Sequence, residues 1–138
     1  MLFIDSFYMF LGQLVVFLAI LIVILGIPTT FFIQMIIGTC GFYTNSIWGM
    51  QIFRKSLISI FSGIIAPIEL FPIWFQKIAN FLPFKELIYT PINIYLGQLS
   101  YNEIGFVIIK QIIWGFVLYV LAKVFFKHAV KNLTINGG

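Results

Sequence analysis

Long apolar segments separated by short polar breaks dominate the chain. The first, Phe7 to Leu25, contains no charged residue and ends at Gly26-Ile27-Pro28-Thr29-Thr30, which favours a helix end or a tight reversal. The others are Phe31 to about Ile52, Ser56 to about Pro67 or Phe71, and Ile104 to about Phe126. Because about 20 apolar residues cross a bilayer as helix, we predict about four transmembrane helices.

The region between the last two apolar segments has a different pattern. The third segment is short for a straight crossing, so we expect a broken or re-entrant helix. From Trp74 to Gly97 the chain is more polar, and Pro83 and Pro91 divide it into short pieces. Within it, Ile73 to Leu82 places apolar residues at helical spacing, which predicts a short interfacial helix.

Composition sets the broad class of the protein. Of the 138 residues, 62% are hydrophobic and 9% are charged, and the mean hydropathy is +1.10. Soluble domains carry roughly 25% charged residues, so this chain has too little polar surface for water. The runs do not alternate between polar and apolar residues, which argues against a transmembrane β-barrel. The predicted fold is an all-α, polytopic helical membrane protein.

The basic residues predict an orientation. Lysine and arginine near helix ends stay on the cytoplasmic side, which places the C-terminus inside. Four crossings would then place the N-terminus inside too. The expected cytoplasmic group comprises Arg54, Lys55, Lys123, Lys127 and Lys131. The long connection mixes Lys77 and Lys85 with Glu69, Glu86 and Glu103, so we assign it to the outside.

The sequence offers no enzymatic chemistry. A phosphate-binding P-loop needs a Gly-Lys pair, and none occurs, so any ATP must be bound by a partner. His128 and Cys40 are the single histidine and cysteine and lie in different segments. We therefore expect no catalytic residue, cofactor or metal site, and the scattered lysines make nucleic-acid binding improbable.

A few polar residues inside the apolar runs are candidates for a transport path. Lys110 lies about two turns inside the last run, where a charge suggests function, although snorkelling or pairing with Glu103 would also accommodate it. Gln34, Asn45 and Gln111 are candidates for the path or for contacts between helices, because polar side chains in membranes often make interhelical hydrogen bonds.

Several motifs together resemble the C-terminal half of type-2 ABC transporter permeases, the membrane subunits of bacterial ABC exporters. They cover about residues 40 to 138. In order, they are Phe61-Ser62-Gly63, Pro67, Pro72, Leu82-Pro83-Phe84, Pro91, Leu96-Gly97, Gln111 with Trp114, and a basic tail before Gly137-Gly138.

The resemblance implies a single transmembrane domain over residues 1–138 that starts near the family's third span, with the N-terminal spans absent. It implies a multi-pass protein of the inner (plasma) membrane. Its implied partners are an ABC ATPase and a second permease copy or a separate N-terminal half. Arg54 and Lys55 would face the ATPase. The implied outer gate comprises Ser62, Gly63, Pro67, Pro72, Pro83, Pro91 and Gly97.

A second class of function remains open. The chain could be a non-transporting membrane anchor, an immunity protein or a truncated permease remnant. Members of the family export lipids, peptides, drugs and polysaccharides through similar apolar paths, so the sequence leaves the substrate class open.

Overall fold

The computed structural model describes residues 2–41, 43 and 47–136, with side chains described from residue 9 to residue 131. The described part of the chain is helical and contains no strand. Its elements are α1 (Leu2–Cys40), α2 (Ile47–Phe61), the 3₁₀ helix η1 (Ile68–Leu70), α3 (Ile73–Phe81), α4 (Lys85–Tyr95) and α5 (Tyr101–Asn136). The predicted all-α class is confirmed.

Helix α1 continues through the predicted break. It has 39 residues with Pro28 inside it, so the expected reversal at Gly26–Thr30 is wrong. Proline removes one backbone donor from a helix. Here the Thr30 hydroxyl lies within hydrogen-bond distance of the carbonyl oxygens of Gly26 (3.2 Å) and Ile27 (2.8 Å). The carbonyl that loses its partner because of Pro28 is that of Ile24, four residues earlier. The Thr30 hydroxyl therefore adds bonds beside the proline and does not replace the missing one.

The chain turns later, between Cys40 and Ile47. The amide of Tyr43 donates to the carbonyl of Cys40 at 3.0 Å, and α2 then runs to Phe61. Arg54 and Lys55 lie in the middle of α2, so the prediction that they end a span is wrong. Lysine and arginine are good helix formers and do not break a helix by themselves. Consequently, neither the predicted Phe31–Ile52 helix nor the predicted start at Ser56 matches an element.

After α2 and η1, two short helices follow, α3 and α4. The predicted helix at Ile73–Leu82 is confirmed as α3, with Pro72 at its N-cap. Pro91 does not divide the next segment, because it lies inside α4. Helix α4 ends in a Schellman motif: the amides of Gly97 and Gln98 donate to the carbonyls of Ile94 and Asn93, both at 2.9 Å.

Helix α5 starts with a capping box. The Glu103 carboxylate accepts hydrogen bonds from the amide (2.8 Å) and hydroxyl (2.7 Å) of Ser100. The amide of Glu103 in turn donates to the Ser100 hydroxyl at 3.4 Å. This reciprocal pair fixes the start of α5 at Tyr101. The predicted apolar run Ile104–Phe126 lies wholly within this helix.

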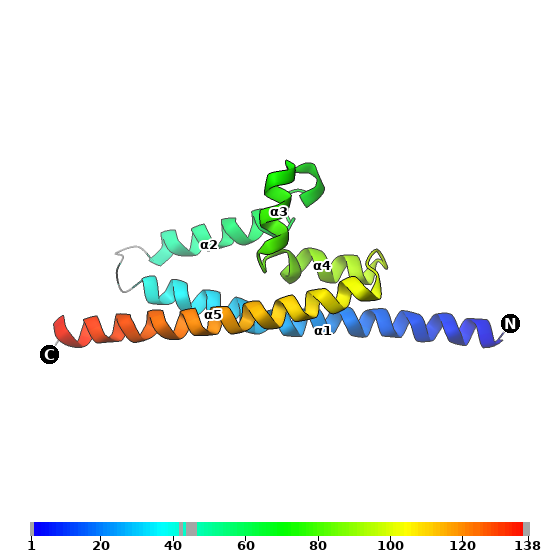
Figure 1. The fold of residues 1–138 in the computed structure, drawn as a ribbon, viewed down its shortest axis with the longest axis horizontal. Coiled ribbons are helices and arrows are strands. Elements are labelled where there is room, and N and C mark those ends of the chain that lie inside the picture. The colour runs from blue at the N-terminus through cyan, green and yellow to red at the C-terminus, as the bar shows by residue number, and fades with distance from the viewer. Residues whose placement is uncertain (1, 42, 44–46, 137–138) are drawn as a thin grey trace.

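Helices α1 and α5 pack side by side and run in the same direction (Figure 1). The Gln111 side chain contacts the backbone of Ile22, and between two and three turns later the ring of Tyr119 lies 5.4 Å from that of Phe32. Both contact positions move toward the C-terminus in α1 and in α5, which shows that the two helices are parallel. The ends marked N and C therefore lie at opposite ends of the molecule, which contradicts the expected placement of both termini on one side.

A small apolar core joins α1, α4 and α5. Its buried members are Ile22, Ile94, Ile104 and Val107, with Val15, Leu18 and Ala19 packed against them. Most other large apolar side chains on α1 and α5 are exposed. In a chain with so few charged residues, such surfaces suit lipid or neighbouring helices.

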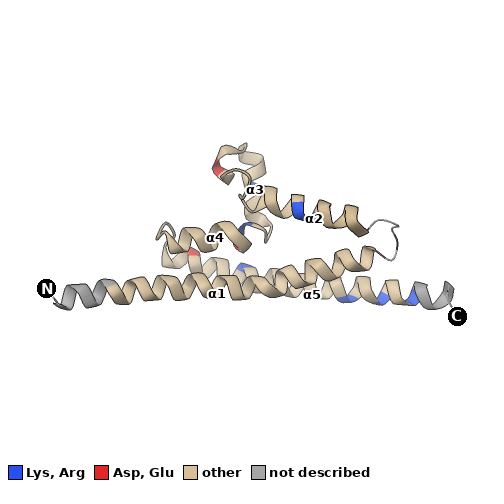
Figure 2. Ribbon diagram, turned by 180° about the vertical axis from the view of Figure 1, so that it is seen from behind, with Lys and Arg blue, Asp and Glu red and all other residues tan. Residues whose placement is uncertain are grey.

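By length and hydropathy, the described helices include two candidate membrane spans, Met9–Cys40 and Tyr101–Lys131. Helix α2 has 15 residues, which corresponds to roughly 22 Å and is shorter than a hydrocarbon core of about 30 Å. The predicted four transmembrane helices are not confirmed. Lysines mark the C-terminal part of α5 (Figure 2), whereas the described carboxylates lie at η1, α4 and the start of α5, where Lys77, Lys85 and Lys110 accompany them.

A polar cavity held against α5

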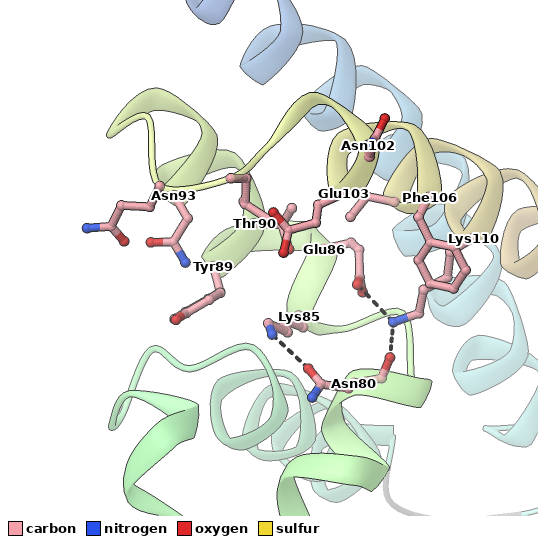
Figure 3. Close-up of a pocket in the computed structure, with 13 residues that line it drawn as sticks. Asn80, Lys85, Glu86, Tyr89, Thr90, Asn93, Asn102, Glu103, Phe106 and Lys110 are labelled. Atoms are coloured by element: carbon pink, nitrogen blue, oxygen red, sulfur yellow. Dashed lines mark hydrogen bonds and ion pairs between the residues drawn. The ribbon is translucent and has the colours of Figure 1, made fainter.

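A polar cavity of about 540 Å³ lies where α3, α4 and the first half of α5 meet (Figure 3). Its polar lining comprises Asn80, Lys85, Glu86, Tyr89, Thr90, Asn93, Gln98, Asn102, Glu103 and Lys110. Most of these residues come from the connection that the sequence analysis assigned to the outside. The cavity adjoins α5, one of the candidate membrane spans.

Lys110 is the central residue of the cavity wall. Its ammonium group forms an ion pair with Glu86 at 2.8 Å, and it also donates to the backbone carbonyl of Asn80 (Figure 3). The side chains of Lys110 and Glu86 are 12% and 5% exposed. The predicted pairing with Glu103 is wrong, because Glu103 bonds Ser100. One cation from α5 therefore holds both α3 and α4.

Two further side chains of α5 strengthen this attachment. The buried Gln111 amide donates to the carbonyl of Ile22 in α1 at 3.2 Å and to that of Glu86 in α4 at 3.4 Å. Trp114 donates its indole N–H to the carbonyl of Phe81 at 2.9 Å, and the two rings meet edge to face. Gln111 is thus a contact between helices.

The chain between α2 and η1 is held against α4 around Gly63. Its φ of +79° lies in the left-handed region, and a Cβ placed there would meet the Tyr89 ring at 3.1 Å. Tyr89 donates its hydroxyl hydrogen to Glu69. This hydrogen bond lowers the pKa of the Glu69 carboxyl. The pKa of the Tyr89 hydroxyl is raised, mainly by burial and then by the same hydrogen bond. The predicted Ser62-Gly63 break therefore packs against α4.

The remaining predicted gate residues shape the same region without forming one cluster. Pro67 and Pro72 are exposed N-caps of η1 and α3. Pro83 is buried in the bend before α4, and Pro91 is buried inside α4. Gly97 has a φ of +69°, which ends α4 in its Schellman motif. Ser62 is fully buried, and its hydroxyl has no hydrogen-bond partner.

Other candidates lie away from the cavity. Gln34 is partly buried in α1, with its amide oxygen unpartnered. Asn45 lies outside the described residues. Arg54 and Lys55 face different surroundings on α2, where Arg54 is partly buried and Lys55 is exposed.

Sequence reasoning missed Glu86, Asn80 and Tyr89 as site residues. It assigned Glu86 only to the outer connection and gave it no partner, whereas this residue is 4% exposed and pairs with Lys110. The available signal was a pair of unusual residues: Glu86, a carboxylate in a short segment rich in aromatic residues, and Lys110, the only lysine in the first half of the last apolar run. Lys85 also lines the cavity, and burial lowers the pKa of its ammonium group.

The comparisons with known proteins identify the family. No curated protein and no solved structure matches the chain significantly. The sequence profile of the family described as ABC-2 family transporter protein matches residues 7–137, nearly the whole chain. This profile covers more than the region from residue 40 on which the motif resemblance rests. The chain belongs to the ABC-2 transporter family, whose permeases are membrane components of transporters.

Proposed function

We propose that the chain is a membrane-spanning permease subunit of an ATP-driven exporter. It forms the translocation path with a second permease copy or a separate N-terminal half, and a separate cytoplasmic ATPase supplies the energy. Family membership supports a permease role. The observation that carries the proposal is the attachment of α3 and α4 to α5 through Lys110. It joins two short helices to a candidate membrane span by a few polar contacts that a movement of α5 could break.

The proposed orientation is that of a multi-pass inner (plasma) membrane protein with a cytoplasmic C-terminus. Lys123, Lys127 and Lys131 mark the C-terminal part of α5, and basic residues at helix ends favour the cytoplasm. Since α1 is parallel to α5, the end of α1 and the start of α2 then face the cytoplasm. Arg54 and Lys55 lie at the middle of α2, about two turns from this end, and remain candidates for ATPase contact.

In this orientation η1, α3 and α4 form the outer gate. Helix α2 rises from the cytoplasmic side and ends at Phe61, short of a full crossing. The chain then bends at Gly63, Pro67, Pro72 and Pro83, and α4 returns along α1 to the start of α5. Closure of the ATPase dimer would tilt the spans, and separation of Lys110 from Glu86 and Asn80 would free the gate.

The first experiment is affinity purification of the chain from its native membranes in mild detergent, followed by mass spectrometry. An ABC ATPase recovered in near-stoichiometric amount would support the proposal, and a co-purifying short membrane chain would identify the second permease component. A tagged membrane protein of another family serves as the control for non-specific recovery. Recovery of the stable chain without an ATPase would contradict the proposed coupling.

A further inference from the structure

Two cavities of opposite character adjoin along α5. The polar cavity of about 540 Å³ reaches the first turn of this helix, at Asn102 and Glu103. A second cavity, of about 240 Å³, is bordered on α5 mainly by Ile109, Ile113 and Trp114. Both cavities are lined by Asn80, Phe106 and Lys110. The polar space therefore continues into an apolar groove farther along the helix.

The order of these surfaces along α5 matches the order of the parts of a lipid. Helix α5 is a candidate membrane span from Tyr101 onward, so its first turn lies near one face of the bilayer. The groove begins roughly two turns farther in. Its Ile109 and Ile113 side chains are 58% and 57% exposed, which suits contact with hydrocarbon. A molecule that filled both cavities would place a polar group at the head-group level and an acyl chain in the bilayer.

The four charged residues of the polar cavity divide into a closed pair and an open pair. Lys110 and Glu86 bind each other at 2.8 Å, with side chains 12% and 5% exposed. Lys85 on α4 and Glu103 on α5 lie in the wall of the same cavity (Figure 3). In the described part of the chain neither of them forms an ion pair. The cavity therefore offers one cation and one anion to a ligand.

Lys85 retains hydrogen-bond donors for an anion. Its ammonium group has three donors, and one of them binds the side-chain oxygen of Asn80 at 2.7 Å. The same nitrogen lies 5.0 Å from the centre of the Tyr89 ring, a contact with the face of the ring that requires no acceptor atom. A phosphate oxygen can accept the remaining donors in charge-assisted hydrogen bonds. Lys85 is thus a counter-charge for a bound phosphate.

Glu103 provides the opposite charge. The amide and hydroxyl of Ser100 both donate to Oε2 of Glu103, so the capping box leaves Oε1 for a ligand. A purely anionic ligand would bring its charge toward Glu103 as well as toward Lys85. A zwitterion instead meets a counter-charge at both residues. A primary ammonium group can also donate a hydrogen bond to Oε1, whereas a quaternary ammonium has no N–H group.

We propose that this paired site binds a phospholipid with a zwitterionic phosphoethanolamine head group. The phosphate accepts hydrogen bonds from Lys85, and the primary ammonium group donates to Glu103. The hydrocarbon chain lies in the groove along Ile109, Ile113 and Trp114. Lys85 and Lys110 offset Glu86 and Glu103, so the formal charge of the lining is zero and matches a net-neutral head group. This inference rests on the proposed function and names the substrate class of the permease.

The test uses the full chain in the uncharged detergent dodecyl maltoside, together with any subunits that co-purify. The probe is phosphatidylethanolamine with a photoreactive diazirine on one acyl chain, and mass spectrometry locates the cross-links. We expect cross-links in segments 80–81 and 106–114, and unlabelled phosphatidylethanolamine should suppress them.

Three competitors examine the parts of the lipid separately. Phosphatidylglycerol has the phosphate without an ammonium group, and phosphatidylcholine has an ammonium without N–H. With the same acyl chains, both should compete roughly threefold to tenfold more weakly than phosphatidylethanolamine, the effect of losing one hydrogen bond. Glycerophosphoethanolamine has the head group without acyl chains and should not compete at the same concentration.

Lys85→Met tests the phosphate contact. It should reduce cross-linking by the phosphatidylethanolamine probe, and by a matching phosphatidylglycerol probe, roughly tenfold, the effect of losing a hydrogen bond to a charged group. Lys77→Met is the matched control, because Lys77 is an exposed lysine of α3 that lines neither cavity. This control should leave both signals unchanged.

Glu103→Gln tests the ammonium contact. Glutamine preserves the capping box at the start of α5 and removes the charge. The preference for phosphatidylethanolamine over phosphatidylglycerol should fall about twofold to fivefold, because ion pairs of exposed side chains are weak. A ratio of two lipids measured on one protein does not depend on how much of the variant is folded. An unchanged ratio would overturn the role of Glu103.

Other results would overturn the site as a whole: equal competition by any of the three competitors, cross-links spread evenly over the lipid-facing side of α5, or equal effects of Lys85→Met and Lys77→Met. If an ABC ATPase co-purifies in these cases, the exporter proposal stands and only the lipid assignment fails. If the ATPase is absent while phosphatidylethanolamine binds as described, the exporter proposal fails and the lipid site stands.

Discussion

The ring of Tyr89 lies 3.1 Å from the point where a Cβ would be placed on Gly63. Gly63 also has a φ of +79°, a conformation that other residues adopt at a cost of roughly 1–2 kcal/mol. The turn after α2 therefore depends on glycine for two reasons, its backbone conformation and the space taken by Tyr89.

We expect Gly63→Leu to block export while the protein still inserts into the membrane, because the side chain would displace Tyr89 and the gate helices. Efflux and membrane insertion are measured on the same cells. Gly97→Leu is the matched control: it has a φ of +69° but no atom within 4 Å of its Cβ position. Normal efflux by Gly63→Leu, or equal loss in both variants, would remove the steric role of Tyr89.

The ion pair between Lys110 and Glu86 should dominate the stability of the gate. Lys110→Met leaves a buried carboxylate without its partner, which we expect to destabilise the fold by about 3–5 kcal/mol. The double variant Lys110→Met, Glu86→Leu removes both charges and should recover much of this loss. Thermal unfolding in detergent measures both.

The control for the ion pair is Lys85→Met, since Lys85 lines the same cavity but forms no ion pair in the described structure. Its effect should be within about 1 kcal/mol. A loss from Lys85→Met as large as that from Lys110→Met would show that the Lys110 pair has no special role.

Acid should loosen the attachment of η1 to α4. The hydrogen bond from Tyr89 lowers the pKa of Glu69 below its ordinary value of 4.5. A carboxyl group with a lowered pKa stabilises the fold above its unfolded pKa and loses this contribution as the pH falls through its folded pKa. The protection factors of η1 and α3 amides, which correct for the pH dependence of intrinsic exchange, should therefore fall below about pH 4.5.

The matched variant for this pH effect is Tyr89→Phe, which keeps the ring beside Gly63 and removes the hydroxyl. Its protection factors should change less over the same pH interval. An identical acid response in both proteins would assign the transition to other groups.

The continuity of α1 predicts a topology that can be measured. Cysteines introduced at Gly12 and Gly38, where a Cβ meets no atom within 4 Å, should react with impermeant reagents from opposite sides of the membrane. The native Cys40 is replaced by Ala for this purpose. Reaction of both cysteines from the same side would support a reversal near Pro28 and contradict a single crossing by α1.

The sequence pattern predicted the helical class and α3, because composition and local periodicity determine both. It failed at Pro28, which lies inside the continuous helix α1, and at Arg54-Lys55, where charged residues lie inside α2. Local sequence rules treat proline and charged residues as helix boundaries. Whether a helix ends at such a residue also depends on its packing against other parts of the chain.

The site was less accessible to such reasoning. The sequence identified Lys110 as unusual, but its partner is 24 residues away on another helix. The same applies to Gln111 and Ile22, which are separated by 89 residues. Pairings of this kind depend on the packing of α1, α4 and α5, which no periodicity within one helix reveals.

The connection between α4 and α5 has a mechanical consequence. The Schellman motif at Gly97 and the capping box at Ser100 and Glu103 leave hardly any free backbone between the two helices. This corner should behave as a stiff elbow that transmits the tilt of α5 to α4. Bending during transport would then concentrate at the opposite end of the gate, between Gly63 and Pro72.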